Sequence, residues 1–510
     1  MGLYDLTFYD LICRNAICYR NRIAFMEADD GSALTFENFK DMVDRLACGL
    51  QGAGIRKGDR IGAIGKNSRE FFLLYGAAAA LGAVMLPVNW RLSLGEMFFN
   101  LNDGEPSIIF SDPEYQPQIE SDRKKLSGNP LLFSIRDASK EFQGLDSLLD
   151  NDGNFVPSDV ASNDGFVIIH TAAVAGRPRG ALLSHNNLLC SNLHFIESLK
   201  ITPDDVHLNL LPVFHIAGLA MLTSAFHAGA LNLNMSRFDA VKAVNLIDEK
   251  QISFFFDFTP ILSNILDQQA KTGKNIRSLR AVIGLDVPDT IEKYQQLSGG
   301  TFYTFYGQTE TSCLATIGRY NERPGAAGKP VMLGNVQLLD DKDSPVAIGD
   351  TGEIAMRGPM VFKGYWGLQD DNSYTFRNGW HHTGDLGRFD EDGYLWYAGR
   401  KPEKELIKPG GENVYPAEVE NAILQHPAVE KCVVFGVPDP KWKEGIKAVC
   451  LLKQGATLTA EVLIKFVGSK IAGYKKPQYV QFVSEFPLKP DGSPDRIKIK
   501  ELFASAQKPS

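Results

Sequence analysis

The chain has 510 residues, of which 44% are hydrophobic and 22% are charged, a balance typical of an ordinary globular protein. This length exceeds what one hydrophobic core can organise, so we expect several domains or subdomains. The formal net charge is −8, but residues 401–510 hold 17 Lys and Arg against 13 Asp and Glu, so the remainder is strongly acidic. An acidic body argues against nucleic acid as a partner.

Seven cysteines are scattered along the chain without CxxC spacing. Their odd number and spacing favour a reducing, cytoplasmic setting over a disulfide framework and do not form a zinc-binding pattern. We expect no secretory signal, because Asp5, Asp10 and Arg14 interrupt any apolar core. The uncharged stretch Phe71–Trp90 is long enough to raise the question of a membrane span. Its alanines, its glycines and Pro87 instead favour a buried helix followed by a strand, and we expect no transmembrane segment.

Helical and strand patterns alternate along the first three fifths of the chain, which predicts parallel sheets with helices on both faces. The predicted helices are Glu37–Gly54 and Phe71–Leu81, and the predicted strands are Arg60–Ile64, Ala83–Val88, Ser107–Phe110, Gly165–His170, Val206–Leu211, Ala230–Met235, Ser253–Phe256 and Ala281–Ile283. From Val336 to Arg400 the pattern changes to short strands and Gly turns, which indicates a small β-rich subdomain. The last 110 residues predict an α+β unit with helices Glu418–His426 and Thr459–Ile471 and strands Lys431–Val437 and Ala448–Lys453.

The segment Tyr306-Gly307-Gln308-Thr309-Glu310 combines groups suited to a nucleotide. The tyrosine ring can lie along a purine, the threonine hydroxyl can bond a phosphate oxygen, and the carboxylate can hold Mg²⁺, a hard cation that takes oxygen ligands. Asp385 follows a Gly turn in His382-Thr383-Gly384-Asp385 and can accept both ribose hydroxyls. A third motif is Gly410-Gly411-Glu412-Asn413-Val414-Tyr415-Pro416.

In this order and spacing the three motifs resemble the adenylate-forming superfamily, which includes acyl-CoA synthetases, peptide-synthetase adenylation domains and beetle luciferases. The resemblance extends from Leu34-Thr35-Phe36 to Lys500. It implies activation of a carboxylic acid with ATP. It also implies an N-terminal adenylation domain over residues 1–399 and a small mobile C-terminal domain over residues 400–510, with the hinge near residues 400–404.

The superfamily binds phosphate with a T-S-G-T-T-G-x-P-K-G loop that follows a strand. Here the matching stretch, residues 171–180, keeps Thr171, Gly176 and the final glycine, while Arg179 replaces the lysine. The other side-chain hydroxyls are lost, but the backbone donors and a positive charge suited to phosphate remain. We favour a weakened but working phosphate loop over an inactive loop or a plain strand–turn–helix junction.

The stretch Pro212-Val213-Phe214-His215 is similar to the superfamily's P-x-F-H segment. The resemblance places His215 at the carboxylate end of the acyl pocket, and the absence of an Asp there favours an uncharged acyl tail. The phenylalanines of the run 254–258 either add apolar walls or fill the core. Gly284 and Asp286 fall in the superfamily's adenine-side loop, where Leu285 and Asp286 replace small residues and change the local pocket.

The resemblance implies that Arg400 joins Asp385 at the ribose. The candidates for the hinge and the CoA path share a position just after Arg400 and are Lys401, Lys404, Lys408, Gly410 and Gly411. Near the end of the chain, Arg496 falls on the superfamily's catalytic lysine and Lys498 is the next candidate. A positive charge there would stabilise the α-phosphoryl transition state. Two further matches, Gly352-Glu353 and Gly364-Tyr365-Trp366, are interpreted as structural.

The predicted protein is thus an AMP-forming acyl-CoA synthetase that acts on a fatty or other apolar acid, with ATP and CoA as co-substrates. Its predicted catalytic residues are His215, Glu310 and Arg496 or Lys498, with Glu310 as the Mg²⁺ ligand. The alternatives are a non-catalytic acyl- or nucleotide-binding homologue and acyl transfer to a carrier protein or an amine. The acid, its chain length and the oligomeric state stay open, a homodimer included.

Overall fold

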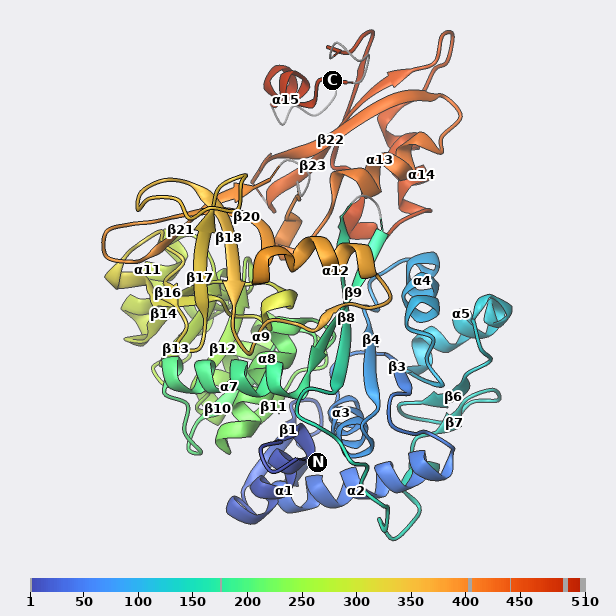
Figure 1. The fold of residues 1–510 in the computed structure, drawn as a ribbon, viewed down its shortest axis with the longest axis vertical. Helices are drawn as coiled ribbons and strands as arrows, with labels where there is room; N and C mark the ends of the chain where they lie inside the picture. Colours follow the sequence, from blue (N-terminus) through green and yellow to red (C-terminus); the bar gives the residue numbers. More distant parts are fainter. Residues whose placement is uncertain (1, 175–176, 402–405, 441, 489–493, 505–510) are drawn as a thin grey trace. The chain divides into compact units, whose positions relative to one another are not determined.

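The computed structural model describes residues 2–174, 177–401, 406–440, 442–488 and 494–504. Contacts between Cα atoms divide the chain into two compact units (Figure 1). The first unit comprises residues 1–90, 100–170 and 180–399, and the second comprises residues 91–99, 171–179 and 400–510. The mixed α/β architecture confirms the predicted fold class.

The first unit contains a nine-stranded sheet whose six inner strands are parallel. In spatial order its strands are β16 (Lys329–Pro330), β15 (Thr316–Arg319), β14 (Thr301–Tyr306), β13 (Ala281–Leu285), β12 (Phe254–Phe258), β10 (Val206–Asn209), β11 (Leu231–Asn234), β1 (Ile23–Glu27) and β2 (Ala33–Thr35). The strands at both edges pair antiparallel.

A second sheet of eight strands is parallel except at the end that holds β9 and β19. Its strands in spatial order are β19 (Gly364–Tyr365), β9 (Arg177–Ser184), β8 (Gly165–Val174), β4 (Val84–Val88), β3 (Arg60–Ile64), β5 (Ile108–Ser111), β6 (Leu131–Ser134) and β7 (Gln143–Gly144). The predicted strands in the first three fifths of the chain are confirmed, with ends shifted by a few residues.

Helices cover the two sheets of the first unit (Figure 1). They are α1 (Phe8–Cys18), α2 (Phe36–Gly52), α3 (Arg69–Leu81), α4 (Leu94–Gly104, which the unit boundary crosses), α5 (Gln116–Ser121), α6 (Asp146–Leu149), α7 (His185–Leu199), α8 (Ile216–Ala228), α9 (Ala240–Lys250), α10 (Ile261–Thr272), α11 (Pro288–Ser298) and α12 (Gln369–Thr375). Helix α3 is buried from Phe71 to Leu81, as a helix that is apolar on every side should be. At Gly76 a Cβ would lie 2.5 Å from Val43 of α2, so the glycine permits close helix packing.

None of the described helices is long and apolar enough to cross a membrane.

The β-rich subdomain predicted from Val336 onward is confirmed as a four-stranded antiparallel sheet. Its strands are β17 (Asn335–Leu339), β18 (Gly352–Arg357), β20 (His381–Phe389) and β21 (Leu395–Arg400). The second unit has a three-stranded sheet of β22 (Val429–Asp439), β23 (Lys443–Leu452) and β24 (Tyr479–Val483) with helices α13 (Pro416–Leu424), α14 (Ala460–Gly468) and α15 (Arg496–Phe503). Both helices and both strands predicted for this part are present.

Candidate active site

The two nucleotide motifs meet at the carboxyl end of β14. The hydroxyl of Tyr306, the last residue of that strand, donates a hydrogen bond of 2.8 Å to Oδ2 of Asp385, and Nε2 of Gln308 donates one of 2.6 Å to the same oxygen. Tyr306 and Asp385 are both buried. The carboxyl ends of parallel strands are the usual place for a ligand in an open α/β sheet. The structure therefore joins Tyr306, Gln308 and Asp385 in one cluster at that edge.

The turn after β14 has no room for a side chain at Gly307. A Cβ there would lie 1.7 Å from the carbonyl oxygen of Cys313, and the amide of Cys313 closes the turn on the carbonyl of Gln308 at 3.0 Å. The 3₁₀ turn η3 (Thr309–Thr311) then carries Glu310. Burial raises the pKa of the Cys313 thiol, which makes it a poor nucleophile.

Glu310 is held in the interior by Tyr365 of β19. The Tyr365 hydroxyl donates a hydrogen bond of 2.8 Å to Glu310 Oε1, and the amide of Phe362 donates one of 3.0 Å to the Glu310 carbonyl. Tyr365 is itself fixed, because its amide donates to Asn372 Oδ1 at 2.6 Å. Sequence analysis interpreted Tyr365 as structural, and no local pattern pointed to its contact with Glu310.

Glu310 can serve as a ligand for Mg²⁺ that arrives with a nucleotide. Within the described ranges, no group of three or more His, Cys, Asp or Glu side chains could hold a metal ion on its own. Mg²⁺ is commonly bound by one or two carboxylates together with water and substrate phosphates. A single buried carboxylate at this turn fits that donor set.

A second aromatic ring lies against Tyr306. The rings of Tyr306 and Tyr397 stack with centroids 6.1 Å apart and planes inclined by 27°. Tyr397, on β21, is 47% exposed, so its ring offers a surface next to the buried cluster. Sequence analysis did not predict this contact.

An apolar cluster lies at the carboxyl end of β12. The ring of Phe258 meets that of His215 edge-on, with centroids 6.3 Å apart. The centroids of the Phe258 and Phe305 rings are 6.4 Å apart. His215 caps α8, where its Nδ1 accepts a hydrogen bond of 3.3 Å from Ala217. Phe255 faces the opposite side of the sheet and belongs to another core cluster. Of the two interpretations of this Phe run, Phe258 fits a wall beside His215 and Phe255 fits the core.

The predicted adenine-side loop follows β13 and is hydrogen-bonded to Thr259, the residue after β12. Asp286 Oδ1 accepts hydrogen bonds from the Thr259 hydroxyl at 3.1 Å and from the Val287 amide at 2.7 Å. At Gly284 a Cβ would lie 2.2 Å from the carbonyl oxygen of residue 257, which explains a glycine in this strand. Leu285, whose bulk was expected to change the pocket, is 41% exposed.

The described residues of the predicted phosphate loop, 171–174 and 177–180, lie on the neighbouring strands β8 and β9, so this stretch is not a strand–turn–helix junction. Strand β8 continues through Val174 and the chain returns as β9 from Arg177, with the Thr171 hydroxyl donating to the Arg179 carbonyl at 3.3 Å. Gly176 lies outside the described residues. Strand β9 also pairs with β19, where Leu182 is in register with Gly364 far along the chain, and no local sequence pattern indicates this pairing.

The His170 side chain, on β8, is 3% exposed, and its Nε2 lies 2.8 Å from Asp103 Oδ2. Sequence analysis did not single out either residue.

The predicted hinge begins where the two units divide. Arg400 is the last residue of β21 and Lys401 follows it, whereas Lys404 lies outside the described residues.

The glycine loop after the hinge is packed within the second unit. The Lys408 amide donates a hydrogen bond of 2.7 Å to Glu444 Oε2. Gly410 has φ of +58°, and a Cβ there would lie 2.8 Å from the ring of Trp442. Gly411 ends the 3₁₀ turn η7 (Pro409–Gly411).

The two candidates for the closing positive charge have different surroundings. Arg496 begins α15, and its guanidinium donates to Glu420 Oε1 at 2.6 Å and to the Val434 carbonyl at 2.9 Å. The Lys498 side chain is 65% exposed, with Nζ 3.4 Å from Asp495 Oδ2. Arg496 is thus tied to the body of the second unit, and Lys498 projects from its surface.

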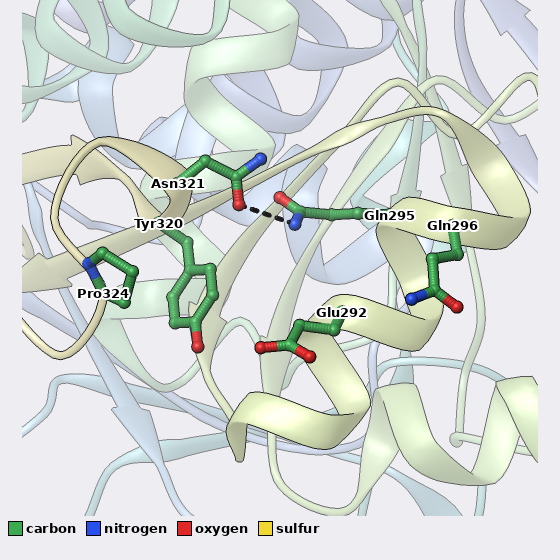
Figure 2. Close-up of a pocket in the computed structure, with 6 residues that line it drawn as sticks. All are labelled: Glu292, Gln295, Gln296, Tyr320, Asn321 and Pro324. Carbon is green, nitrogen blue, oxygen red and sulfur yellow. Dashed lines mark hydrogen bonds between the residues drawn. The ribbon is translucent and has the colours of Figure 1, made fainter.

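A hollow of about 560 Å³ lies on the first unit between α11 and the 3₁₀ turn η4 (Tyr320–Glu322). Figure 2 shows the residues that line it, which are Glu292, Gln295, Gln296, Tyr320, Asn321 and Pro324. Gln295 and Asn321 bond to each other across it at 2.8 Å. None of the predicted site residues lines this hollow.

Comparisons with known proteins show the family of the chain. Residues 13–366 match the AMP-binding enzyme family and residues 418–492 match the AMP-binding enzyme C-terminal domain. The chain is 32% identical to a feruloyl-CoA synthase from Amycolatopsis sp over 482 residues, covering 93% of this chain and 94% of the relative. It is 31% identical to an indoleacetate–CoA ligase from Aromatoleum aromaticum, covering 95% of each.

Among solved structures, o-succinylbenzoate CoA synthetase from Bacillus subtilis superposes with a TM-score of 0.84 at 25% identity, covering 98% of this chain and 99% of that one. The chain belongs to the AMP-binding enzyme family, and within the adenylate-forming superfamily it is of the acyl-CoA synthetase type.

Proposed function

We propose that the chain joins a carboxylic acid with an uncharged, apolar tail to CoA at the expense of ATP, releasing AMP and pyrophosphate. The observation that carries this proposal is the buried cluster in which Tyr306 and Gln308 both donate to one oxygen of Asp385, with Glu310 two residues further along the same turn. Two named relatives, a feruloyl-CoA synthase and an indoleacetate–CoA ligase, support the class of reaction.

In the first half-reaction a carboxylate oxygen of the acid attacks the α-phosphorus of ATP. The bond between the α-phosphorus and the bridging oxygen breaks, and pyrophosphate leaves with the electron pair. We assign Asp385 and Arg400 to the ribose, Tyr306 to the purine, and Thr171, Arg179 and Thr309 to the phosphates. Gly284 and Asp286 would border the adenine. Bound Mg²⁺, held by Glu310 and phosphate oxygens, would offset the negative charge of the triphosphate.

In the second half-reaction the CoA sulfur attacks the acyl carbon, AMP leaves, and the thiol proton passes to solvent. The protein's part in both steps is positioning and charge stabilisation, because neither step demands a strong general base. We assign Arg496 or Lys498 to the first step. For the second step we assign the loop of Gly410 and Gly411 to the pantetheine path, with Lys401 and Lys408 beside the hinge.

The acid is inferred from the side chains around His215. Phe258 meets the His215 ring edge-on and contacts Phe305, so an acid that lies here meets apolar rings. Such a surface suits an aromatic or aliphatic tail and disfavours a second charge, since burying an unpaired charge is costly. The proposal therefore includes aryl acids such as phenylpropenoates as well as fatty acids.

The test is acid-dependent exchange of radiolabelled pyrophosphate into ATP, followed by mass spectrometry of the product formed when CoA is added. The panel holds ferulate, indoleacetate, hexanoate, dodecanoate and the dicarboxylate succinate. We expect exchange and acyl-CoA formation with at least one apolar acid and none with succinate. Nucleotide binding without exchange for any acid would instead support a non-catalytic binding homologue. Exchange without acyl-CoA would point to a carrier protein or an amine as the acceptor.

A further inference from the structure

The turn that carries Asp385 interrupts the pairing of β18 with β20. Glu353 is in register with Leu386 and Ala355 is in register with His382, so the single residue Ile354 faces the three residues 383–385. These three residues form a bulge, and bulges commonly re-aim a side chain beside an active site. Backbone groups released from a ladder need other partners when they are buried.

Two side chains supply those partners. Thr383 Oγ1 donates to the Ile354 carbonyl at 2.6 Å and accepts from the Asp385 amide at 3.1 Å. Oε1 of Glu353 accepts a hydrogen bond of 2.9 Å from the Gly384 amide, the residue directly before Asp385. Gly384 has φ of +71°, which a residue with a side chain rarely adopts. The backbone amides of Gly384 and Asp385 are thus each held by a side chain.

Glu353 is a buried carboxylate whose second oxygen is balanced by positive or polar groups. It is 4% exposed, and its Oε2 lies 3.2 Å from Nη2 of Arg377 and 3.2 Å from Nδ1 of His382. The guanidinium of Arg377 is in turn held by both oxygens of Asp343, at 3.0 and 3.1 Å. A buried charge with this many partners is placed with little freedom to move.

We propose that Glu353 is a positioning residue for nucleotide binding: it fixes the Gly384 bulge and thereby aims the Asp385 carboxylate at the ribose. The inference rests on the proposed function, in which Asp385 receives the ribose hydroxyls. Tyr306 and Gln308 donate to the Asp385 carboxylate itself, whereas Glu353 accepts from the backbone amide of the preceding residue, Gly384. Removing the Glu353 carboxylate removes the hydrogen bond that the Gly384 amide donates to it. It also removes the carboxylate oxygen that lies against Arg377 and His382.

The experiment compares the binding of ATP and 2′,3′-dideoxy-ATP by calorimetry, which isolates the contribution of the ribose hydroxyls. The parent should prefer ATP. Glu353→Ala should weaken ATP binding about tenfold, the scale of one hydrogen bond to a charged group, and leave the dideoxy analogue unchanged. In an Asp385→Ala background, Glu353→Ala should cost ATP affinity almost nothing further, because residues that act as one unit are not additive. KM for ATP should rise while KM for the acid does not.

Asp205→Ala is the matched control. Asp205 is also a buried, paired carboxylate, bonded to Arg280 at 2.8 and 2.7 Å, but it precedes β10 at the amino end of the sheet. It should lower the unfolding temperature and leave the preference for ATP intact. If Glu353→Ala does not fold, Glu353→Gln takes its place. Its amide cannot serve both the Gly384 donor and the Arg377 donor as a carboxylate does, so a smaller loss of preference is expected.

The possible outcomes distinguish an error in the ribose assignment of Asp385 from an error in the positioning role of Glu353. If Asp385→Ala keeps the full preference for ATP, the ribose assignment in the proposed function is wrong. If Asp385→Ala abolishes the preference while the Glu353 variants keep it, the positioning role is wrong and the proposed function stands. Equal weakening of ATP and dideoxy-ATP in the Glu353 variants would likewise overturn the proposal, because it would show a general structural role.

Discussion

The phenol of Tyr365 donates a hydrogen bond of 2.8 Å to Oε1 of Glu310, and both side chains are buried. The two residues come from different sheets, since Glu310 follows β14 and Tyr365 belongs to β19, which pairs with β9. A hydrogen bond to one carboxylate oxygen limits how the carboxylate can rotate. Tyr365 therefore links the proposed metal ligand to the sheet that holds the described residues of the predicted phosphate loop.

We predict that Tyr365→Phe weakens the binding of Mg·ATP about tenfold or more, because Glu310 loses a charge-assisted hydrogen bond worth about 1.5–3 kcal/mol. The measurement is the affinity for ATP by calorimetry across a Mg²⁺ titration. Tyr9→Phe is the matched control, since the Tyr9 hydroxyl also donates to a carboxylate, Asp44 Oδ1, at 2.8 Å. An equal shift in the Mg²⁺ requirement of both variants would contradict the assignment.

We predict that Gly307→Ala abolishes ATP binding and lowers the unfolding temperature by several degrees. The added Cβ would lie 1.7 Å from the Cys313 carbonyl oxygen, so the turn that carries Glu310 must move. Overpacking of this kind costs about 1–3 kcal/mol or more. Gly52→Ala is the control: it ends α2, has nothing within 4 Å of the new Cβ, and should be neutral. A Gly307→Ala variant that binds ATP as the parent does would refute the rigid-turn interpretation.

Three buried histidines predict how stability depends on pH. Burial lowers the pKa of His185, His207 and His227 to about 4 each. In the unfolded chain a histidine titrates near its ordinary pKa of about 6.5, so the unfolded state takes up protons first as the pH falls. The contribution of these histidines to the free energy of unfolding is therefore fully present above about pH 6.5. It is lost between about pH 6.5 and 4, at up to about 1.4 kcal/mol per pH unit for each histidine.

The measurement is the unfolding temperature at pH 7.5 and at pH 5. His207→Gln should narrow the difference, because the amide can still bond Asn232, the partner of His207 at 2.8 Å, but does not titrate. The same difference in parent and variant would show that His207 is not charged on unfolding.

Sequence reasoning succeeded where one segment carries its own signal. The apolar runs predicted as strands became β12 and β13, and the Gly turn predicted before Asp385 is present, with Gly384 at a φ of +71°. It failed where function depends on pairing between distant segments. No spacing rule relates Tyr365 to Glu310 or Glu353 to Gly384, because each contact exists only once separate strands have formed.

The same limit explains the predicted phosphate loop. The sequence of residues 166–170 predicts a strand followed by a loop. No local pattern indicates that β9 (Arg177–Ser184) would pair with the edge strand β19. Residues 181 and 182 pair with residues 365 and 364, so this pairing could be identified only in the folded structure.

The last prediction concerns Arg496, which sequence analysis aligned with the catalytic lysine of the superfamily. We predict that Arg496→Ala cripples acyl-AMP formation, measured by acid-dependent pyrophosphate exchange, and spares thioester formation from supplied acyl-AMP and CoA. The reason is that a positive charge stabilises the transition state only of the first step. Arg496→Lys should recover exchange, because it restores the superfamily's own residue.

Arg496 also bonds Glu420 and the Val434 carbonyl, so Arg496→Ala is compared with Glu420→Gln, which weakens the same anchor without removing the charge. Lys498→Ala tests the neighbouring candidate. Equal losses in both half-reactions for Arg496→Ala would refute the division of labour, and normal exchange in Arg496→Ala beside a crippled Lys498→Ala would move the catalytic charge to Lys498.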